Sequence, residues 1–542
     1  MVDPITPNLV ILLKIHVFDA LNKYFNFPSN YQMFLKIEVI YTPLFKTINS
    51  ILLFLLLLLL TLSCGLPSSQ KTVRKDTNSS KSKNTRLPPT PNIIIGTYLG
   101  NPQRNYYGNK APNQLQVIWR TPIGKGKTIV GRDTLEWGGA GWTGQPLLVQ
   151  EGHQKYLIHG AFDHHLRKIN AQTGEVVWKY QFDDAIKGTG CLWPYTDPKT
   201  GQQKLLILQG SRLGISFKAK VVPSYRAIDY QTSQEVWRLN SEATASYSRD
   251  VDGTALIVGQ EAYLGLENGF FIHFNPHPQQ ATHRQGMKQP RILHKTVLYT
   301  PRDMGLRRGD LVTESSPALL GNKIYISAGS GHVYGYNLAK HRLDWDFYIG
   351  ADIDGSPAVT QDKHLIISFE KQYIPGKGGV MKLNPKRYGK QAVEWFYPVN
   401  DANFAEWRGG IVGSVAINDA YRKSNKTPAL AAFMAIDGYL YVVNHQKITQ
   451  QKVASPDTLH QYRTPKLVFK QKIGASISTP IFVGNKLIAA NYYGIYLFEF
   501  DDQLRFKLTA QREGKFESTP IVDDGKIFIA SRDGYFYCFG EK

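Results

Sequence analysis

Residues 171–178 read Ala-Gln-Thr-Gly-Glu-Val-Val-Trp, and this short pattern returns in altered form several times along the chain. The closest copy is residues 230–237, Tyr-Gln-Thr-Ser-Gln-Glu-Val-Trp, and weaker copies end at Trp119, Trp345 and Trp395. Each copy follows a strand-like run and a set of residues suited to a turn. Self-similarity at a period of roughly 40–60 residues, with no helical pattern between the copies, predicts a β-propeller.

One repeat shows how a propeller blade is built from these residues. Residues 156–160 and 166–170 have the composition of strands, and polar turns separate them. Gly174 suits the turn position that needs a positive φ. Residues 176–180, Val-Val-Trp-Lys-Tyr, are rich in β-branched and aromatic side chains and are expected to form the outer strand.

A second recurring element introduces each blade, most often as a hydroxyl residue followed by proline. Proline is tolerated at the first residue of a strand because no ladder donor is needed there. The clear copies are Thr143-Gly144-Gln145-Pro146, Glu314-Ser315-Ser316-Pro317, Asp354-Gly355-Ser356-Pro357, Ser478-Thr479-Pro480 and Glu517-Ser518-Thr519-Pro520. Copies without proline begin at Asp252, Val412 and, more loosely, Thr189. Together they predict eight blades that start near residues 143, 189, 252, 314, 354, 412, 477 and 517, with seven blades as the alternative.

The two ends of the repeat region complement each other. Residues 115–120, Leu-Gln-Val-Ile-Trp-Arg, form an outer strand that has no blade of its own, and the last unit reaches Lys542 without a Trp-bearing outer strand. Pairing them would close the ring and remove two exposed sheet edges. The predicted fold is therefore an all-β, single propeller of about eight four-stranded blades over residues 115–542, closed by an N-terminal outer strand.

At the level of these repeats the chain resembles the PQQ-like, quinoprotein-type propellers. That group contains quinoprotein alcohol dehydrogenases and the non-enzymatic BamB-type outer-membrane assembly lipoproteins. The resemblance covers residues 115–542 and implies the fold. One fold hosts unrelated activities, so it does not by itself select a function.

The front of the chain reads as a leader. Residues 51–60 are apolar and too few for a membrane span, as in the core of a signal peptide. Cys64 follows and resembles the lipidated cysteine of bacterial lipoproteins; an uncleaved anchor is the alternative. Met33, with Lys36 and Lys46 after it, is a candidate start of translation. We therefore expect a leader over 1–63.

The stretch that follows the leader is rich in Ser, Lys, Asn and Pro, and residues 64–114 are expected to hold the lipid-anchor Cys64 and a flexible tether. Such an anchor implies a periplasm-facing envelope lipoprotein. By resemblance to enterobacterial sorting, Gly65 after Cys64 favours the outer membrane. The other cysteines, Cys191 and Cys538, fall in different blades and are expected to be buried thiols.

The net charge of +21 has two interpretations. A solvated basic surface aids solubility, whereas a functional one attracts anionic envelope polymers such as phospholipid, lipopolysaccharide or acidic polysaccharide. No nucleic-acid motif occurs, and an exported protein makes a nucleic-acid partner unsuitable.

The start elements also carry acidic residues that should gather at the mouth of the central channel. Asp252, Glu314, Asp354 and Glu517 occupy one column, three residues before the proline position. Asp250 and Asp352 lie two residues earlier, on the same face of an extended chain. This ring would bind Ca²⁺ or a cationic ligand. The alternative is a structural salt-bridge ring, since Lys187, Arg249 and Arg408 interleave with the carboxylates.

The tryptophans divide into two groups. Five occupy the repeat position and are assigned to packing between blades: Trp119, Trp178, Trp237, Trp345 and Trp395. The other four are expected beside the carboxylates: Trp137, Trp142, Trp193 and Trp407. Aromatic platforms next to carboxylates suit a sugar or a flat cofactor, and plugging of the channel mouth is the alternative.

Catalytic signatures are weak. The resemblance would imply PQQ with Ca²⁺ for a dehydrogenase, but the adjacent cysteine pair expected for that class is absent. His273, His277, His283 and His294 match no standard zinc spacing, and the polar insertion 275–289 is expected to be disordered. No catalytic residue is assigned, no cofactor is expected, and the metal is left open.

The sequence favours a non-enzymatic envelope scaffold or binding module, most concretely in outer-membrane protein assembly. Insertions at 195–224, 276–292 and 445–465 distinguish the chain from that pattern. The alternative is a quinoprotein-like oxidoreductase or a saccharide-binding protein that works at the channel mouth.

Overall fold

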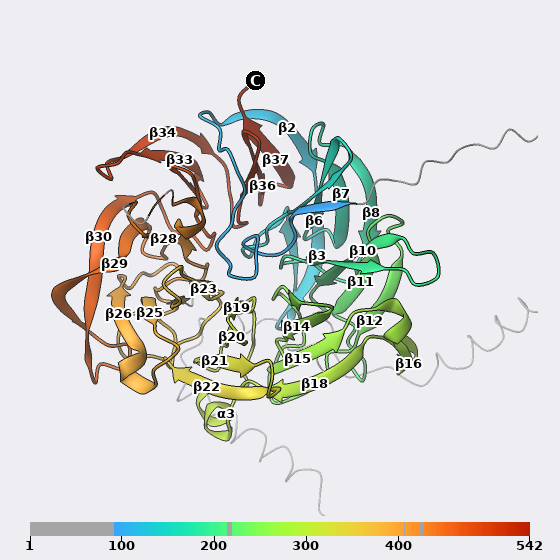
Figure 1. Cartoon of the computed structure of the whole chain (residues 1–542), viewed down its shortest axis with the longest axis horizontal. Coiled ribbons are helices and arrows are strands. Elements are labelled where there is room, and N and C mark those ends of the chain that lie inside the picture. The colour runs from blue at the N-terminus through green and yellow to red at the C-terminus, as the bar shows by residue number, and fades with distance from the viewer. Residues whose placement is uncertain (1–90, 214–218, 406, 423, 425–426) are drawn as a thin grey trace, which may run out of the picture. The chain divides into compact units, whose positions relative to one another are not determined.

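A computed structural model describes residues 91–542, except 214–218, 406, 423 and 425–426. Within this part the chain forms a ring of eight β-sheets, the blades of a propeller (Figure 1). The predicted fold class and blade number are thus confirmed. The leader over 1–63, Met33 and Cys64 lie outside the described residues.

Blades 1 to 4 follow one another along the chain, each with its innermost strand first. Blade 1 is β1 (Asn92–Ile95), β5 (Leu147–Glu151), β6 (Gln154–Gly160), β7 (His165–Asn170) and β8 (Val176–Gln181). Blade 2 is β9 (Cys191–Thr196), β10 (Gln203–Gly210), β11 (Tyr225–Asp229) and β12 (Glu235–Leu239). Blade 3 is β13 (Leu256–Val258), β14 (Glu261–Gly265), β15 (Phe270–Asn275) and β18 (Arg291–Val297). Blade 4 is β19 (Ala318–Leu320), β20 (Lys323–Ser327), β21 (His332–Asn337) and β22 (Arg342–Tyr348).

Blades 5 to 8 complete the ring. Blade 5 is β23 (Ala358–Val359), β24 (Leu365–Phe369), β25 (Gly379–Leu383) and β26 (Val393–Pro398). Blade 6 is β27 (Ala416–Ile417), β28 (Leu430–Met434), β29 (Tyr439–Ala454) and β30 (Gln461–Lys472). Blade 7 is β31 (Ile481–Val483), β32 (Lys486–Ala490), β33 (Gly494–Phe500) and β34 (Phe506–Glu513). Blade 8 is β35 (Ile521–Asp523), β36 (Lys526–Ala530), β37 (Tyr535–Gly540) and β2 (Gln116–Pro122).

The last blade combines both ends of the repeat region, as the sequence predicted. Strand β2 pairs antiparallel with β37, with Trp119 opposite Cys538. This pairing supplies the outer strand that the C-terminal unit lacks. It leaves no blade incomplete and so removes two open sheet edges.

The start elements link the blades around the axis. The N–H of Ser316 donates to Ser356 Oγ of the next blade at 2.8 Å, and the N–H of Ser356 donates to Ser414 Oγ at 3.0 Å. The same bond joins Gln145 to Thr189, Thr254 to Ser316 and Ser414 to Thr479. The hydroxyl residue of the recurring element is therefore the acceptor that links neighbouring blades at five boundaries.

Tryptophans link the blades a second time at the rim. Each of the five repeat-position tryptophans donates its indole N–H to a backbone carbonyl of the next blade. The pairs are Trp119 with Ala171, Trp178 with Tyr230, Trp237 with Pro276, Trp345 with Arg387 and Trp395 with His445, at 2.8–3.2 Å. The expected packing role of these side chains is confirmed. The apolar core lies between successive blades, as where Phe271 of blade 3 and Ile326 of blade 4 share one cluster.

The propeller unit begins earlier than the expected boundary at residue 115. Strand β1 pairs with β5, and the segment after it crosses the middle of the ring (Figure 1). Arg104 is fully buried and donates to the carbonyl of Pro317 at 2.8 Å, while Tyr98 Oη lies 2.9 Å from Thr479 Oγ1. Residues 92–114 therefore do not form a tether, because these buried bonds fix them to several blades.

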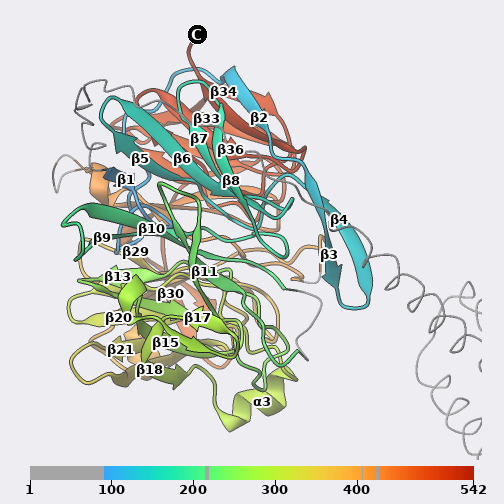
Figure 2. The same cartoon turned by 90° about the vertical axis from the view of Figure 1, so that its right-hand side faces the viewer.

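Two hairpins and one helix extend from the blades. The hairpin β3 (Lys125–Val130) and β4 (Asp133–Gly138) projects on the side opposite β1 (Figure 2). The insertion that was expected to be disordered forms the hairpin β16 (Thr282–Arg284) and β17 (Met287–Gln289). Helix α3 (Pro301–Arg307) starts with a Thr300 capping box. Of the helices in the described residues, none is long and apolar enough to cross a membrane.

We expect Ser356→Ala to destabilise the ring. The change leaves the buried N–H of Ser316 without its acceptor, which costs about 1–3 kcal/mol. Urea unfolding followed by tryptophan fluorescence measures the difference. Ser356→Thr keeps a hydroxyl, as other blades do at this position, and should stay close to the parent. An unchanged midpoint for the alanine variant would contradict the proposed role of this bond.

Candidate functional site

The candidate site is a cavity of about 660 Å³ whose lining includes residues of several blades and Val130 of the β3–β4 hairpin. Neighbouring strands of a blade run in opposite directions, so the start of its first strand and the end of its second strand lie at the same end of the propeller. The segments before the first strand and after the second strand therefore lie side by side. Five carboxylates line the cavity: Asp310, Glu314, Asp352, Asp354 and Glu370. A narrower space below it runs along the axis between Trp142 and Tyr98.

Lys187 connects three of the expected site residues. Its ammonium group pairs with Asp252 and lies 3.7 Å from Glu314 Oε1 and 4.7 Å from the centre of the Trp142 ring. Trp142 donates its indole N–H to Glu314 Oε2 at 2.9 Å. Burial opposes the charged ammonium, but Asp252, Glu314 and Glu267 together raise the pKa of Lys187. Lys187 thus remains a cation among carboxylates from two following blades, as in the salt-bridge alternative.

One lysine does not neutralise the carboxylates around it. Ligand oxygens of Asp252, Glu267 and Glu314 lie within 4.8 Å of one another. Burial raises the pKa of Asp252 to about 6, with Lys187 acting against this and Glu314 adding to it. Burial also raises the pKa of Glu267 well above its usual value. The Oε1 atom of Glu267 is buried without a hydrogen-bond partner among the described residues.

A second acidic group occupies the other side of the cavity. Burial raises the pKa of Asp352, Asp354 and Glu370 well above their usual values, and the neighbouring carboxylates raise them further. Asp352 Oδ1 is buried and has no hydrogen-bond partner in the described part of the chain. Asp310 accepts a hydrogen bond from the Tyr373 hydroxyl at 2.5 Å. Carboxyl groups therefore outnumber guanidinium groups in the cavity lining, and their raised pKa values favour the protonated, neutral form.

Aromatic side chains form the rim. The ring centres of Trp142 and Trp407 lie 6.1 Å apart, and Tyr247 and Tyr373 line the same cavity. Trp142 and Thr143 both have positive φ, 54° and 62°. Two consecutive non-glycine residues in this region are uncommon and cost conformational energy. The strained turn directs the Trp142 ring onto Lys187 and Glu314.

Not every predicted residue lies in this cavity. Glu517 lies next to Trp142. Its Oε2 accepts hydrogen bonds from the backbone N–H of Trp142 at 3.3 Å and from the guanidinium group of Arg532 at 3.2 Å. Asp250 accepts from the N–H of Leu213 at 2.9 Å and faces Arg212. These two carboxylates have protein partners and fit the structural interpretation.

Four of the cationic and aromatic predictions lie elsewhere. Trp193 is buried in the innermost strand of blade 2, stacked on Tyr195. Trp137 lies on the projecting hairpin, where Arg212 covers its ring at 4.9 Å. Arg249 donates to the carbonyl of Ser241 at 2.6 Å. Arg408 lines a neighbouring cavity of about 590 Å³ with Tyr373.

Sequence reasoning did not find Glu267, Asp310, Glu370 and Arg307. Glu370 directly follows the second strand of blade 5, and Glu267 lies two residues after the second strand of blade 3. The positions of Glu267 and Glu370 could have been predicted from the sequence, because an antiparallel sheet brings the end of its second strand next to the start of its first strand. Arg307 ends helix α3, and its position depended on how that helix packs.

The donor set suits a cation. Carboxylate oxygens are the ligands that Ca²⁺ prefers, and unpaired buried oxygens gain most from one. The residues do not fit the anionic cofactor PQQ by itself. Five carboxylates but only two guanidinium groups, from Arg307 and Arg308, line the cavity. The two cysteines in the described residues, Cys191 and Cys538, are buried in separate blades.

We expect the cavity carboxyls to stabilise the protein more at pH 5 than at pH 8, while the buried His159, whose pKa burial lowers to about 3, acts in the opposite direction. The cavity carboxyls hold protons more tightly folded than unfolded. Their stabilising contribution is complete below the unfolded pKa near 4 and is lost as pH rises through the folded value, about 6 for Asp252. Thermal midpoints across this range measure the effect. Glu370→Gln should raise the midpoint, relative to the parent, more at pH 8 than at pH 5, and the exposed Glu175→Gln should not. An effect of Glu370→Gln that is equal at both pH values would disprove this account.

Comparison with known proteins agrees with the fold. The model of the PQQ_2 family, described as "Outer membrane protein assembly factor BamB", matches residues 112–383, half of the chain. No curated protein matches the chain in sequence.

Solved propellers resemble it in fold alone. BamB from Moraxella catarrhalis is 11% identical with a TM-score of 0.46, over 79% of this chain and 100% of that chain. Quinohemoprotein alcohol dehydrogenase from Comamonas testosteroni is 11% identical with a TM-score of 0.49, over 83% and 81%. A europium-containing methanol dehydrogenase is 10% identical with a TM-score of 0.47, over 82% and 98%. On the family match over half of its length, the chain belongs to the PQQ_2 family, the family of the outer membrane protein assembly factor BamB.

Proposed function

We propose that this protein is a non-enzymatic scaffold of the cell envelope that serves in outer-membrane protein assembly. The observation that carries the proposal is the family match over residues 112–383, which runs from the closing strand β2 to β25 of blade 5. The candidate lipid-anchor Cys64 agrees with it, because an anchor would hold the propeller at a membrane. The net charge of +21 favours an anionic envelope surface nearby.

The rim supplies a surface for a partner strand. The ribbon β29–β30 of blade 6 is built from strands of 16 and 12 residues and projects from the ring (Figure 1). It carries large exposed apolar side chains, Ile448 at 42% and Leu459 at 76% exposure. An extended peptide that adds to such an edge gains main-chain hydrogen bonds, and pockets for its side chains give specificity.

Affinity purification of the anchored protein from gently solubilised envelope tests this proposal. We expect stoichiometric recovery of an outer-membrane barrel or of its assembly partners, identified by mass spectrometry. The double change Ile448→Asp with Leu459→Asp should reduce recovery at least about tenfold, because two charges would be desolvated in the interface. Val177→Asp, at an apolar residue of blade 1 that is 52% exposed, is the matched control. Recovery of the propeller alone would refute the scaffold proposal.

A second candidate function is binding of a cation, alone or as part of a hydroxylated ligand such as a sugar, in the axial cavity. It is favoured by the buried, unpartnered Oδ1 of Asp352, which lines the cavity together with Trp142 and Trp407. A divalent ion there would replace the shared protons of the carboxyl groups and relieve their mutual repulsion. The aromatic rings would then cover the flat face of a bound sugar.

Calorimetric titration with Ca²⁺ alone at pH 8 tests the cavity. We expect saturable binding that Asp352→Asn weakens at least about tenfold, since one charged ligand is lost. The surface variant Glu175→Gln should bind as the parent does. Binding that is absent, or equal in all three proteins, would assign the carboxylates to structure and remove this candidate.

A further inference from the structure

The boundary between blades 3 and 4 differs from the tryptophan-linked boundaries at one position. In blade 1, Trp178 lies opposite Lys168 immediately before a β-bulge. In blade 3 the residue opposite His273, again immediately before a bulge, is His294. A histidine therefore occupies the place from which a tryptophan contacts the next blade elsewhere in the ring.

The next blade also carries a histidine at the matching contact. Gly174 of blade 1 lies four residues before Trp178 and directly against the Trp119 ring. Four residues before Trp345 the chain has His341, with a positive φ of 50°. A side chain in this backbone region is held there at some cost in conformational energy. Histidine thus replaces both residues of this contact between blades: His294 stands in place of the tryptophan, and His341 stands in place of the turn glycine of blade 1.

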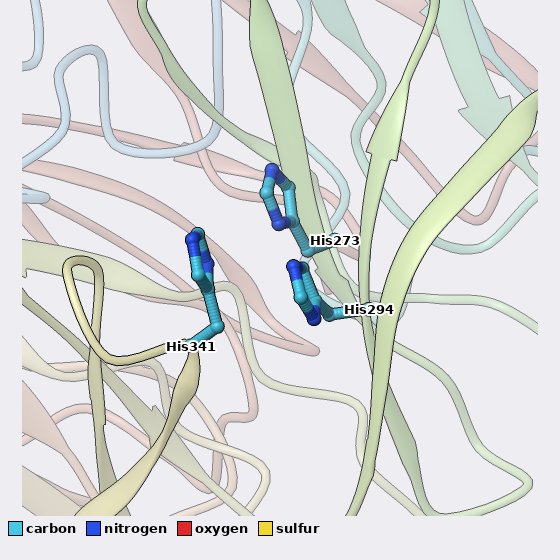
Figure 3. A group of neighbouring side chains, drawn as sticks. All are labelled: His273, His294 and His341. Atoms are coloured by element: carbon cyan, nitrogen blue, oxygen red, sulfur yellow. The ribbon is translucent and has the colours of Figure 1, made fainter.

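Together with His273 these residues form a group of three imidazoles (Figure 3). The rings of His294 and His341 lie 4.2 Å apart, and that of His273 lies 5.4 Å and 5.6 Å from them. One ring nitrogen from each residue falls within 4.8 Å of the others. His273 and His294 come from adjacent strands of blade 3, and His341 comes from the β21–β22 turn of blade 4.

His273 is held in the state that a metal ligand needs. Its Nε2 lies 2.6 Å from Glu261 Oε2, and its ring stacks on Tyr263 at 4.3 Å. A carboxylate at this distance accepts a hydrogen bond from Nε2–H, so the ring proton stays on Nε2 and Nδ1 keeps its lone pair. That Nδ1 is buried and has no hydrogen-bond partner among the described residues. A carboxylate on the remote nitrogen is the usual support of metal-binding histidines.

We propose that His273, His294 and His341 bind a divalent transition metal such as Zn²⁺ between blades 3 and 4. Three imidazoles with an open fourth position are an established ligand set for zinc. Nitrogens bound to tetrahedral zinc lie about 3.3 Å apart, given Zn–N distances near 2.05 Å. The stacked rings must turn for this, because a metal lies in the plane of each ring that binds it. His294 and His341 are exposed and have the space to turn, whereas His273 stays fixed.

The metal ion would link blades 3 and 4 at the position where a tryptophan links other pairs of blades. The indole N–H of a tryptophan joins five neighbouring pairs of blades, and a metal held by two residues of blade 3 and one of blade 4 would join this pair. Binding only to the folded state raises its stability in proportion to the logarithm of the free metal concentration. The site is separate from the axial cavity and does not depend on the proposed scaffold function.

Isothermal titration with Zn²⁺, on the full chain purified without a polyhistidine tag and under reducing conditions, tests the proposal. We expect saturable binding of one ion and a thermal midpoint that rises with zinc. His341→Gly installs the residue that blade 1 has at this position, so the fold is retained while a ligand is lost. This variant should lose at least about tenfold in affinity, and Glu261→Gln, which alters only the support of His273, about 10–100-fold.

The exposed His153→Gln is the matched control and should bind zinc as the parent does. Equal affinity of parent and His341→Gly would overturn the proposal, as would the absence of saturable binding by the parent. In either case the three rings would serve only to pack blade 3 against blade 4.

Discussion

The ring depends on one repeated hydrogen bond, from the backbone N–H at the start of one blade to a Ser or Thr hydroxyl at the start of the next. Every member is buried, so the bond forms where water cannot replace it and its loss leaves an unpaired donor. It fixes the innermost strands relative to one another. The tryptophans then repeat the linkage at the outer radius, where the indole N–H reaches the neighbouring blade. Two concentric sets of polar contacts therefore hold an otherwise apolar blade interface in register.

The same element builds the candidate site. Asp252, Glu314 and Asp354 each lie two residues before the hydroxyl that makes the ring bond. Residues two apart in an extended chain point to the same side, so fastening the hydroxyl to the next blade also turns the carboxylate towards the axis. The concentration of carboxyl groups is thus a consequence of how the blades are joined. The pKa values of Asp252 and Asp354 are raised because several carboxyl groups are buried close together with too few cations beside them.

Different segments of the chain line the central axis of the propeller and the acidic cavity. On one side the segment after β1 fills the ring and ties Arg104 and Tyr98 to distant blades. Elsewhere, the acidic cavity is lined by Trp142, Trp407 and Val130 of the β3–β4 hairpin. Among the described residues, the lining of the acidic cavity and the β29–β30 ribbon have no residue in common. The scaffold and the cavity-binding proposals therefore use separate surfaces.

The sequence by itself determined the blade count, the blade starts and the closure of the ring, because the pattern of strand, turn and Trp or Ser-Pro is local and repeats. It also located the column containing Asp252, Glu314 and Asp354, since that column is part of the repeat. Only the tertiary structure placed Glu267, Glu370 and Arg307 beside them, turned Trp193 into the core, and brought His341 to His294 from another blade. These contacts join segments that are distant in the chain, and their geometry follows from how whole blades pack. Periodicity fixes which residues share a face of one strand, but not which faces of different blades meet.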